Sequence, residues 1–176
     1  MALTIAFPEA DEYADFHRGY IAAVTGERDA LPVLERQRAA IDAFGRLSPQ
    51  QAGHRYAEGK WSVREIVGHL SDSERILSYR LLCIARGDQT PLPGFDEEAY
   101  GAQSNADRRT LGDLVEELSV VRQSTLALAR SLDESFLTRR GTVRNWTLSV
   151  RALAFVIAGH FEHHVHMLRD RYGIVL

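Results

Sequence analysis

One stretch decides the fold class: residues 149–172, which read SVRALAFVIAGHFEHHVHMLRDRY. Its apolar side chains recur at the spacing of an α-helix and not at the alternation of a strand. One stripe of this helix is expected to face the core, and it contains Leu153, Ile157, His160, His164 and either Met167 or Leu168. Ser149–Tyr172 is therefore predicted to be a long buried helix whose inner stripe carries two histidines.

Helical periodicity also dominates the rest of the chain, and strand signals are nearly absent. Ser62 and Glu65 form the pattern of a capping box, in which two side chains satisfy free amide groups at the start of a helix. We predict five helices: Pro8–Thr25, Pro32–Leu47, Ser62–Arg86, Thr110–Leu132 and Ser149–Tyr172. A small strand pair would fit best between Leu137 and Thr147.

The connections between these helices indicate a bundle. The segment Gly87–Arg109 is too long for a tight turn between antiparallel helices, but such a crossover can join two parallel neighbours in a four-helix bundle. The chain contains no internal repeat. We therefore expect an all-α protein in which residues 1–176 form one four-helix-bundle domain, with residues 1–30 as an N-terminal helical extension.

The composition narrows the class of protein. The 176 residues carry a net charge of −3 with both signs interspersed, so no basic patch predicts binding to nucleic acid. No apolar run approaches the roughly 20 residues of a membrane-spanning helix, and the first residues do not form a signal-peptide core. Cys83 is the only cysteine, which excludes an internal disulfide. We expect a reduced, cytoplasmic protein with no nucleic-acid or membrane partner.

Three of the seven histidines predict a metal site. His160 and His164 are four residues apart, so they project from one helix face and can bind one ion together. His69 lies in another apolar helical run and is expected to face them. Three neutral imidazoles plus an exchangeable position form the ligand set of a catalytic metal, and imidazole suits zinc, nickel and iron alike. We predict one divalent ion bound by His69, His160 and His164.

The remaining histidines differ in their expected positions. His163 flanks the face of His160 and would replace His164 if His164 did not bind the metal. His166 is expected to be in solvent, because it lies far round the helix from His160. His17 has no second ligand nearby in the sequence, so a structural role is expected for it.

Three charged residues are candidates for contacts with a ligand or with the substrate. Asp72, three residues after His69, could orient a ligand imidazole, although a solvated helix position explains it equally well. Arg80 or Arg122 could clamp a substrate carboxylate, but an ordinary interhelical salt bridge is the commoner role of such arginines. Cys83 lies about 21 Å from His69 along the same helix, which is too far for a metal ligand.

An ordered set of motifs covering about residues 32–172 carries a resemblance to a known family. The motifs are RYAEGKWSVREIVGHL at 55–70, Asp72–Arg75 with Tyr79 and Arg80, LPGFD at 92–96, and Ala158-Gly159-His160 with His163 and His164. This set resembles the DinB-like (DNA-damage-inducible) superfamily, and within it the bacillithiol transferases and the YfiT-type metal-dependent hydrolases. The resemblance implies up-down-down-up connectivity and a divalent metal on His69, His160 and His164.

The resemblance also implies an activity, because members of this superfamily transfer low-molecular-weight thiols to electrophiles. No general base is evident beside the predicted metal, which favours a metal-dependent thiol transferase over a hydrolase. The alternatives are a metal-dependent hydrolase with the same ligands, or a non-enzymatic, stress-associated metal-binding module that dimerises through the bundle. The expected partners are a small-molecule substrate, in the first case a low-molecular-weight thiol, and a second copy of the chain in a homodimer.

Overall fold

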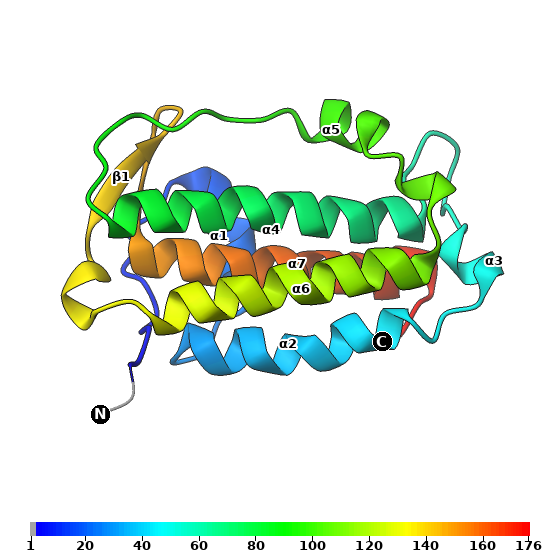
Figure 1. Cartoon of the computed structure of the whole chain (residues 1–176), viewed down its shortest axis with the longest axis horizontal. Coiled ribbons are helices and arrows are strands. Elements are labelled where there is room, and N and C mark those ends of the chain that lie inside the picture. The colour runs from blue at the N-terminus through cyan, green and yellow to red at the C-terminus, as the bar shows by residue number, and fades with distance from the viewer. Residues whose placement is uncertain (1–2) are drawn as a thin grey trace.

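Four long helices form the body of the molecule in a computed structural model that describes residues 3–176 (Figure 1). These helices are α2 (Ala30–Phe44), α4 (Val63–Ala85), α6 (Leu111–Arg130) and α7 (Val150–Tyr172). Each of them packs against two or more of the others, and α7 lies against both α2 and α4. Within residues 3–176 no helix is long and apolar enough to cross a membrane.

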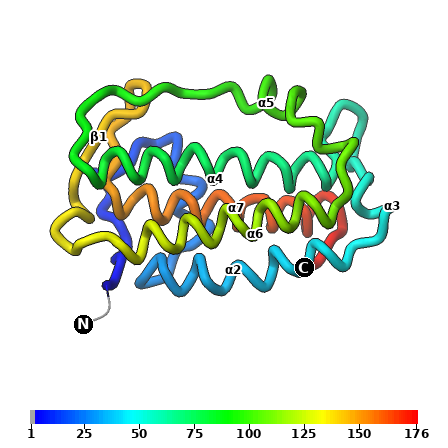
Figure 2. The backbone as a smooth tube through the Cα atoms, viewed as in Figure 1, coloured from blue at the N-terminus to red at the C-terminus, as the bar shows by residue number. Residues whose placement is uncertain are grey.

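The four helices have up-down-down-up connectivity. Helices α2 and α7 run in one direction, and α4 and α6 run in the other (Figure 1). The crossover between α4 and α6 returns along the length of the bundle, so these two helices lie parallel and pack against each other (Figure 2). The four-helix bundle and its long crossover are therefore confirmed.

Side-chain caps fix the starts of the long helices. Ser62 Oγ accepts a hydrogen bond from the Glu65 amide (3.1 Å), and a Glu65 carboxylate oxygen accepts one from the Ser62 amide (2.7 Å). Thr110 and Ser149 cap α6 and α7, and the hydroxyl oxygen of each accepts one hydrogen bond from a backbone amide. The amide groups of the first turn have no partner inside the helix, so these caps stabilise the predicted starting points.

The N-terminal helix predicted for Pro8–Thr25 is wrong in its first half. The first helical residues form the 3₁₀ helix η1 (Asp15–His17), and α1 covers only Arg18–Ala23. The carboxylate of Glu12, which is buried, accepts a hydrogen bond from the Arg151 side chain at the start of α7 (2.6 Å). A tertiary contact thus ties this segment to the bundle and overrides its helical periodicity.

Several short elements lie outside the predicted helices: α3 (Pro49–Ala52), α5 (Glu97–Gln103), η2 (Ala106–Arg108) and η3 (Glu134–Phe136). The region expected to hold a strand pair forms an antiparallel hairpin of β1 (Arg140–Val143) and β2 (Trp146–Ser149). The crossover joins this hairpin, because the Leu92 amide donates to the Thr142 carbonyl and the Arg144 amide donates to the Leu92 carbonyl (both 2.9 Å). Hairpin and crossover therefore form one continuous wall at this end of the bundle.

Helix α1 crosses α7 at a glycine. A Cβ atom on Gly159 would overlap the backbone carbonyl of Tyr20, so no side chain fits between the two helices at this point. The glycine lets α1 lie against α7 immediately before His160. As a result the Tyr20 ring packs edge-on against the His160 ring, with 5.2 Å between the ring centroids.

The core consists of two apolar clusters. One lies beside α1 and the hairpin and includes Leu77 and Ile157, while the other lies toward the opposite end of the bundle and includes Leu70 and Phe161. On α4 the boundary between the clusters falls after Leu70, and on α7 it falls between Ala158 and Phe161. Buried polar residues occupy this boundary.

Candidate metal centre

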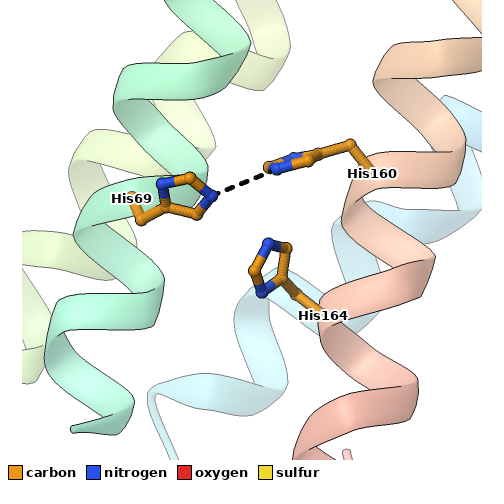
Figure 3. A group of neighbouring side chains, drawn as sticks. All are labelled: His69, His160 and His164. Carbon is orange, nitrogen blue, oxygen red and sulfur yellow. Dashed lines mark hydrogen bonds between the residues drawn. The ribbon is translucent and has the colours of Figure 1, made fainter. Parts of the chain in front are cut away.

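Three buried histidines meet at the boundary between the apolar clusters. His69 on α4 and His160 and His164 on α7 turn their rings toward one another (Figure 3). One nitrogen from each ring lies within 4.8 Å of the other two, and the Nε2 atoms of His69 and His160 are 3.1 Å apart. Nitrogen ligands of a tetrahedral ion are about 3.3–3.4 Å apart when each metal–nitrogen bond is about 2.0–2.1 Å. The three donors are therefore close to the spacing that a metal ion needs.

Burial keeps these imidazoles uncharged at neutral pH. It lowers the pKa of His69 to about 4, and it holds the pKa of His160 and of His164 well below the ordinary value. A neutral imidazole keeps a nitrogen lone pair that can bind a metal. In addition, Nδ1 of His164 is buried without a hydrogen-bond partner among residues 3–176. The convergence of three neutral rings, each with a free lone pair, fits a metal-binding role better than a purely structural one.

Serine, and not aspartate, lies beside the ring of His69. Ser73 Oγ is 3.4 Å from each ring nitrogen of His69. The carboxylate of Asp72 instead faces Arg75 at 3.6 Å, and in the described part of the chain it makes no hydrogen bond to His69. The structure therefore brings Ser73 close to the imidazole, and of the two roles considered for Asp72 it does not show contact with His69.

The other residues of the histidine-rich segment point elsewhere. His163 is exposed, with its ring against Tyr20 (5.6 Å between centroids), and it does not belong to the group of three. His166, expected in solvent, is half-buried. Glu162 accepts a hydrogen bond from Gln37 on α2 (2.9 Å). The structure thus places His164, and not His163, beside His160 and His69.

Arg122 takes part in an interhelical salt bridge and not in the site. It is fully buried, and its Nε and Nη2 atoms each donate to a Glu74 carboxylate oxygen at 2.8 Å. Its Nη1 atom donates to the side-chain oxygen of Gln37 (2.7 Å). A guanidinium whose parallel N–H groups already donate to one carboxylate has no second pair of N–H groups free to bind a substrate carboxylate.

Arg80 is buried in a different way. Only 8% of the residue is exposed, yet within residues 3–176 no carboxylate lies within the 4.0 Å of a salt bridge. Its Nη2 atom donates to the Pro93 carbonyl (2.9 Å), and its guanidinium carbon lies 5.7 Å from the centre of the Phe95 ring. Of the two candidate arginines, only Arg80 forms no salt bridge within residues 3–176, and the charge of Glu97 acts on it from a distance.

A cavity of about 60 Å³ connects Arg80 with the histidines. Four segments that are distant in the sequence form its walls, namely η1 with α1, α4, the crossover and the hairpin, and α7 adds His160. Its polar lining includes His17, Ser73, Arg80, Glu97, Arg144 and His160. Any small molecule in this cavity would therefore contact one of the three histidines.

Glu97 is the only carboxylate in this lining. It is half-buried, and burial, followed by the neighbouring charge of Glu98, raises the pKa of its carboxyl group. A carboxyl group with a raised pKa in a cavity is suited to exchange protons with a bound molecule.

Comparison with known proteins places the chain in a family. The family model described as the DinB superfamily matches residues 34–168. The chain belongs to the DinB superfamily. A protein of Oceanobacillus iheyensis that is named a putative metal-dependent hydrolase is 29% identical over 124 residues, which cover 68% of this chain and 69% of that protein. YfiT from Bacillus subtilis, described as a probable metal-dependent hydrolase with an unusual four-helix bundle topology, has a TM-score of 0.71 at 19% identity, covering 96% of this chain and 94% of YfiT.

The DinB-superfamily motifs in the sequence contain the three histidines, but not the other polar residues of the cavity. Glu97 directly follows the LPGFD motif at 92–96, and this position is its only sequence signal. Arg144 lies in the segment expected to hold strands, and nothing there indicates a role in a site. His17 was expected to be structural, whereas it lines the cavity. These residues meet only because the crossover, the hairpin and η1 converge over His160.

Proposed function

We propose that this protein is a metal-dependent hydrolase that acts on a small molecule in the cavity beside His160. His69, His160 and His164 would hold one divalent ion, for which zinc, nickel and iron are all suitable. The ion would supply Lewis acidity and would lower the pKa of a water molecule in its exchangeable position. The names of the two relatives, which both describe metal-dependent hydrolases, support this reaction class.

The position of Glu97 is the observation that favours hydrolysis over thiol transfer. In hydrolysis the water oxygen bonds to an electrophilic carbon of the substrate, the bond to the leaving group breaks, and a proton passes from the water to the leaving group. Glu97 lines the same cavity as His160, and its raised pKa suits a group that takes up the proton and then returns it. Glu97 thus supplies the general base that was missing near the histidines in the sequence.

Transfer of a low-molecular-weight thiol to an electrophile is the second candidate. Cys83 does not line the cavity, so the thiol would have to be a cosubstrate such as bacillithiol, mycothiol or glutathione. Arg80 and Arg144 in the cavity would suit the carboxylates of bacillithiol or glutathione. Three properties remain predictions from the sequence: assembly as a homodimer, a single domain and a cytoplasmic location. Light scattering of the purified protein tests the homodimer.

Metal analysis and activity assays test the proposed function together. Untagged protein reconstituted with zinc, nickel or iron should bind one ion per chain, and His160→Ala should abolish this uptake. A panel of esters and amides should then be hydrolysed by the wild type. Glu97→Gln should lower hydrolysis about 10²–10⁴-fold with unchanged metal content, as expected for loss of a general base. Glu116→Gln, an exposed change on α6 away from the cavity, serves as the matched control.

The same protein separates the alternatives. Thiol transfer that is lost in His160→Ala but retained in Glu97→Gln would favour the transferase. A metal-loaded protein that catalyses neither reaction would support the non-enzymatic binding module. A protein that takes up no metal after reconstitution would contradict both enzymatic proposals.

A further inference from the structure

The cavity beside the histidines contains a buried arginine that forms no salt bridge within residues 3–176, although the charge of Glu97 acts on it from a distance. Arg80 is 8% exposed, and among residues 3–176 its side chain makes one hydrogen bond, to the uncharged Pro93 carbonyl. A buried charge without a partner is costly, and Arg122 in the same bundle avoids this cost by pairing with Glu74. The position of Arg80 therefore suggests that its partner is a ligand.

A second arginine is held at the same cavity by an unusual backbone. Arg144 occupies the two-residue turn of the hairpin with a φ of 55°, a conformation that costs energy for a residue other than glycine. Its guanidinium carbon lies 5.6 Å from the centre of the Trp146 ring. Its side chain also runs over Gly94, where a Cβ atom would overlap it. The turn, Trp146 and Gly94 together direct a cation to the cavity.

The charges that line the cavity do not balance. Arg80 and Arg144 contribute two positive charges to the lining and Glu97 contributes one carboxylate, while Asp96 and Glu98 lie outside it, at the adjoining opening that Arg144 and Glu97 also line. His17 also lines the cavity, but burial lowers its pKa to about 4, so it is uncharged at neutral pH. An excess of positive charge in a partly enclosed space attracts an anion.

The spacing along α4 limits the size of that anion. Ser73, Leu77 and Arg80 lie on one face of the helix and all line the cavity, and Ser73 is the neighbour of His69. Seven residues along a helix span about 10 Å, and a helical side chain leans toward the N-terminus, which for Arg80 is the direction of His69. A molecule that reaches from the guanidinium to the histidines is therefore no longer than roughly 10 Å.

Aromatic rings form the apolar part of the cavity wall. The rings of Phe16 and Trp146 are stacked, with 4.4 Å between their centroids, and Phe95 lies on the crossover side. Flat apolar groups pack well against such rings. The cavity of about 60 Å³ is too small for a whole aromatic molecule, so it offers arginines for the charged end only. The body of the molecule would extend into the adjoining opening of about 650 Å³, which Phe16 and Phe95 also line.

We propose that Arg80 and Arg144 bind the carboxylate of a small aromatic acid and so direct its reactive bond toward the three histidines. A guanidinium presents parallel N–H groups that match the two oxygens of a carboxylate. Arg80 would hold the carboxylate inside the cavity, and the exposed Arg144 would cover it from the hairpin. The turnover of such a substrate rests on the proposed hydrolase function, but its binding does not.

Calorimetric titration with phenylacetate and with phenylacetamide, its uncharged analogue, tests the proposal. Both compounds are titrated into metal-free and into zinc-loaded protein. The acid should bind at least about tenfold more tightly than the amide in both forms, as expected for hydrogen bonds to a charged group. Arg80→Gln should remove this preference, and Arg144→Gln should reduce it about threefold because Arg144 is more exposed. Arg86→Gln, an exposed change at the end of the same helix, is the control.

Each contrary result has a distinct meaning. Equal binding of acid and amide, or no binding of either, would overturn the arginine site even in a protein that loads zinc and hydrolyses esters. Preference for the acid only in the zinc-loaded form would overturn it as well, because the carboxylate would then bind the metal. Inorganic phosphate that displaces phenylacetate at a tenfold lower concentration would overturn the assignment to a carboxylate.

Two further checks keep the test independent of other failures. Acid-selective binding by a protein that takes up no zinc would support the arginine site while contradicting the proposed hydrolase. Because Arg80 is buried, Arg80→Gln is first checked for its helical circular dichroism; should it fail to fold, Arg144→Gln at the exposed turn decides the outcome, and an unchanged preference there overturns the proposal.

Discussion

Two neighbouring polar clusters in the bundle core satisfy their buried groups to very different degrees. In the arginine cluster (Gln37, Glu74 and Arg122), the Arg122 guanidinium is held by a bidentate carboxylate and an amide, and Gln37 in turn donates to the Ala158 carbonyl (2.8 Å). In the histidine cluster (His69, His160 and His164), one buried nitrogen has no partner within residues 3–176. Both clusters are almost fully buried.

This difference separates a structural cluster from a functional one. The arginine cluster joins α2, α4, α6 and α7 through hydrogen bonds, and its donors are nearly all used. The histidine cluster and the nearby Arg80 keep unused binding capacity, and both border the same cavity. Burial alone does not distinguish Arg122 from Arg80, whereas the presence of a carboxylate partner does.

Breaking the arginine cluster should have the largest effect on stability. Glu74→Gln leaves the Arg122 charge buried without a counter-charge, so the free energy of unfolding should fall by about 3–5 kcal/mol. Urea denaturation measures this change. The double variant Glu74→Met with Arg122→Met should regain most of the loss, because it removes both charges. A loss below about 1 kcal/mol for Glu74→Gln would show that the cluster is not a structural centre.

Breaking the histidine cluster should act on metal binding more than on stability. His164→Ala removes one of three proposed ligands, so zinc affinity should fall by more than about 100-fold. Loss of a residue that only hydrogen-bonds to a metal ligand costs about 10–100-fold, and loss of a ligand itself should cost more. Competition with a chelator measures the affinity. The metal-free variant should lose less stability than Glu74→Gln does. His163→Ala is the matched control, and a greater loss of affinity in His163→Ala would identify His163 as the ligand.

Acid should destabilise the side of the molecule that holds the cavity. Burial lowers the pKa of His17 to about 4, so the unfolded chain takes up a proton on this residue first as the pH falls below about 6.5. Stability is therefore lost on acidification, by about 2 kcal/mol between pH 7 and pH 5 for this residue. Urea denaturation of metal-free wild type and His17→Gln at both pH values measures it. An equal fall in both proteins would contradict the assignment to His17.

Removal of the only thiol should have the smallest effect. Cys83 is half-buried on α4 and belongs neither to the two clusters nor to the cavity lining. Cys83→Ser should change stability by less than about 0.5–1 kcal/mol and should leave metal content and turnover unchanged. Loss of activity in Cys83→Ser, measured beside retained activity in His164→Ala, would replace the metal-centred mechanism with a cysteine-based one.

The parts of the structure that depend on local sequence were predictable. The capping box of Ser62 and Glu65 and the helical periodicity define α4, and the i, i+4 spacing places His160 and His164 on one face of α7. His69 could be expected to face them because its helix is apolar on adjacent faces. These features need only the geometry of a single helix.

The parts that depend on distant contacts were not predictable in the same way. The pattern around Arg80 and Arg122 is alike, and only the arrangement of α4 against α6 shows which arginine meets Glu74. The segment before Asp15 has helical periodicity but does not form a helix, because the Glu12 carboxylate accepts a hydrogen bond from the distant Arg151. Glu97 and Arg144 lie at the cavity because of the path that the crossover and the hairpin turn take. The periodicity of apolar residues does not predict the path of such connections.

The close approach of α1 to Gly159 has a consequence for the order in which the protein matures. A chain that is still being synthesised exposes His69 well before α7 exists, so a partial chain holds no group of three histidines. Tyr20 can reach its place against His160 only after that last helix has formed. A metal that binds all three histidines would therefore enter only once α7 has packed against α4, and α1 closes over a site whose histidines come from these two helices.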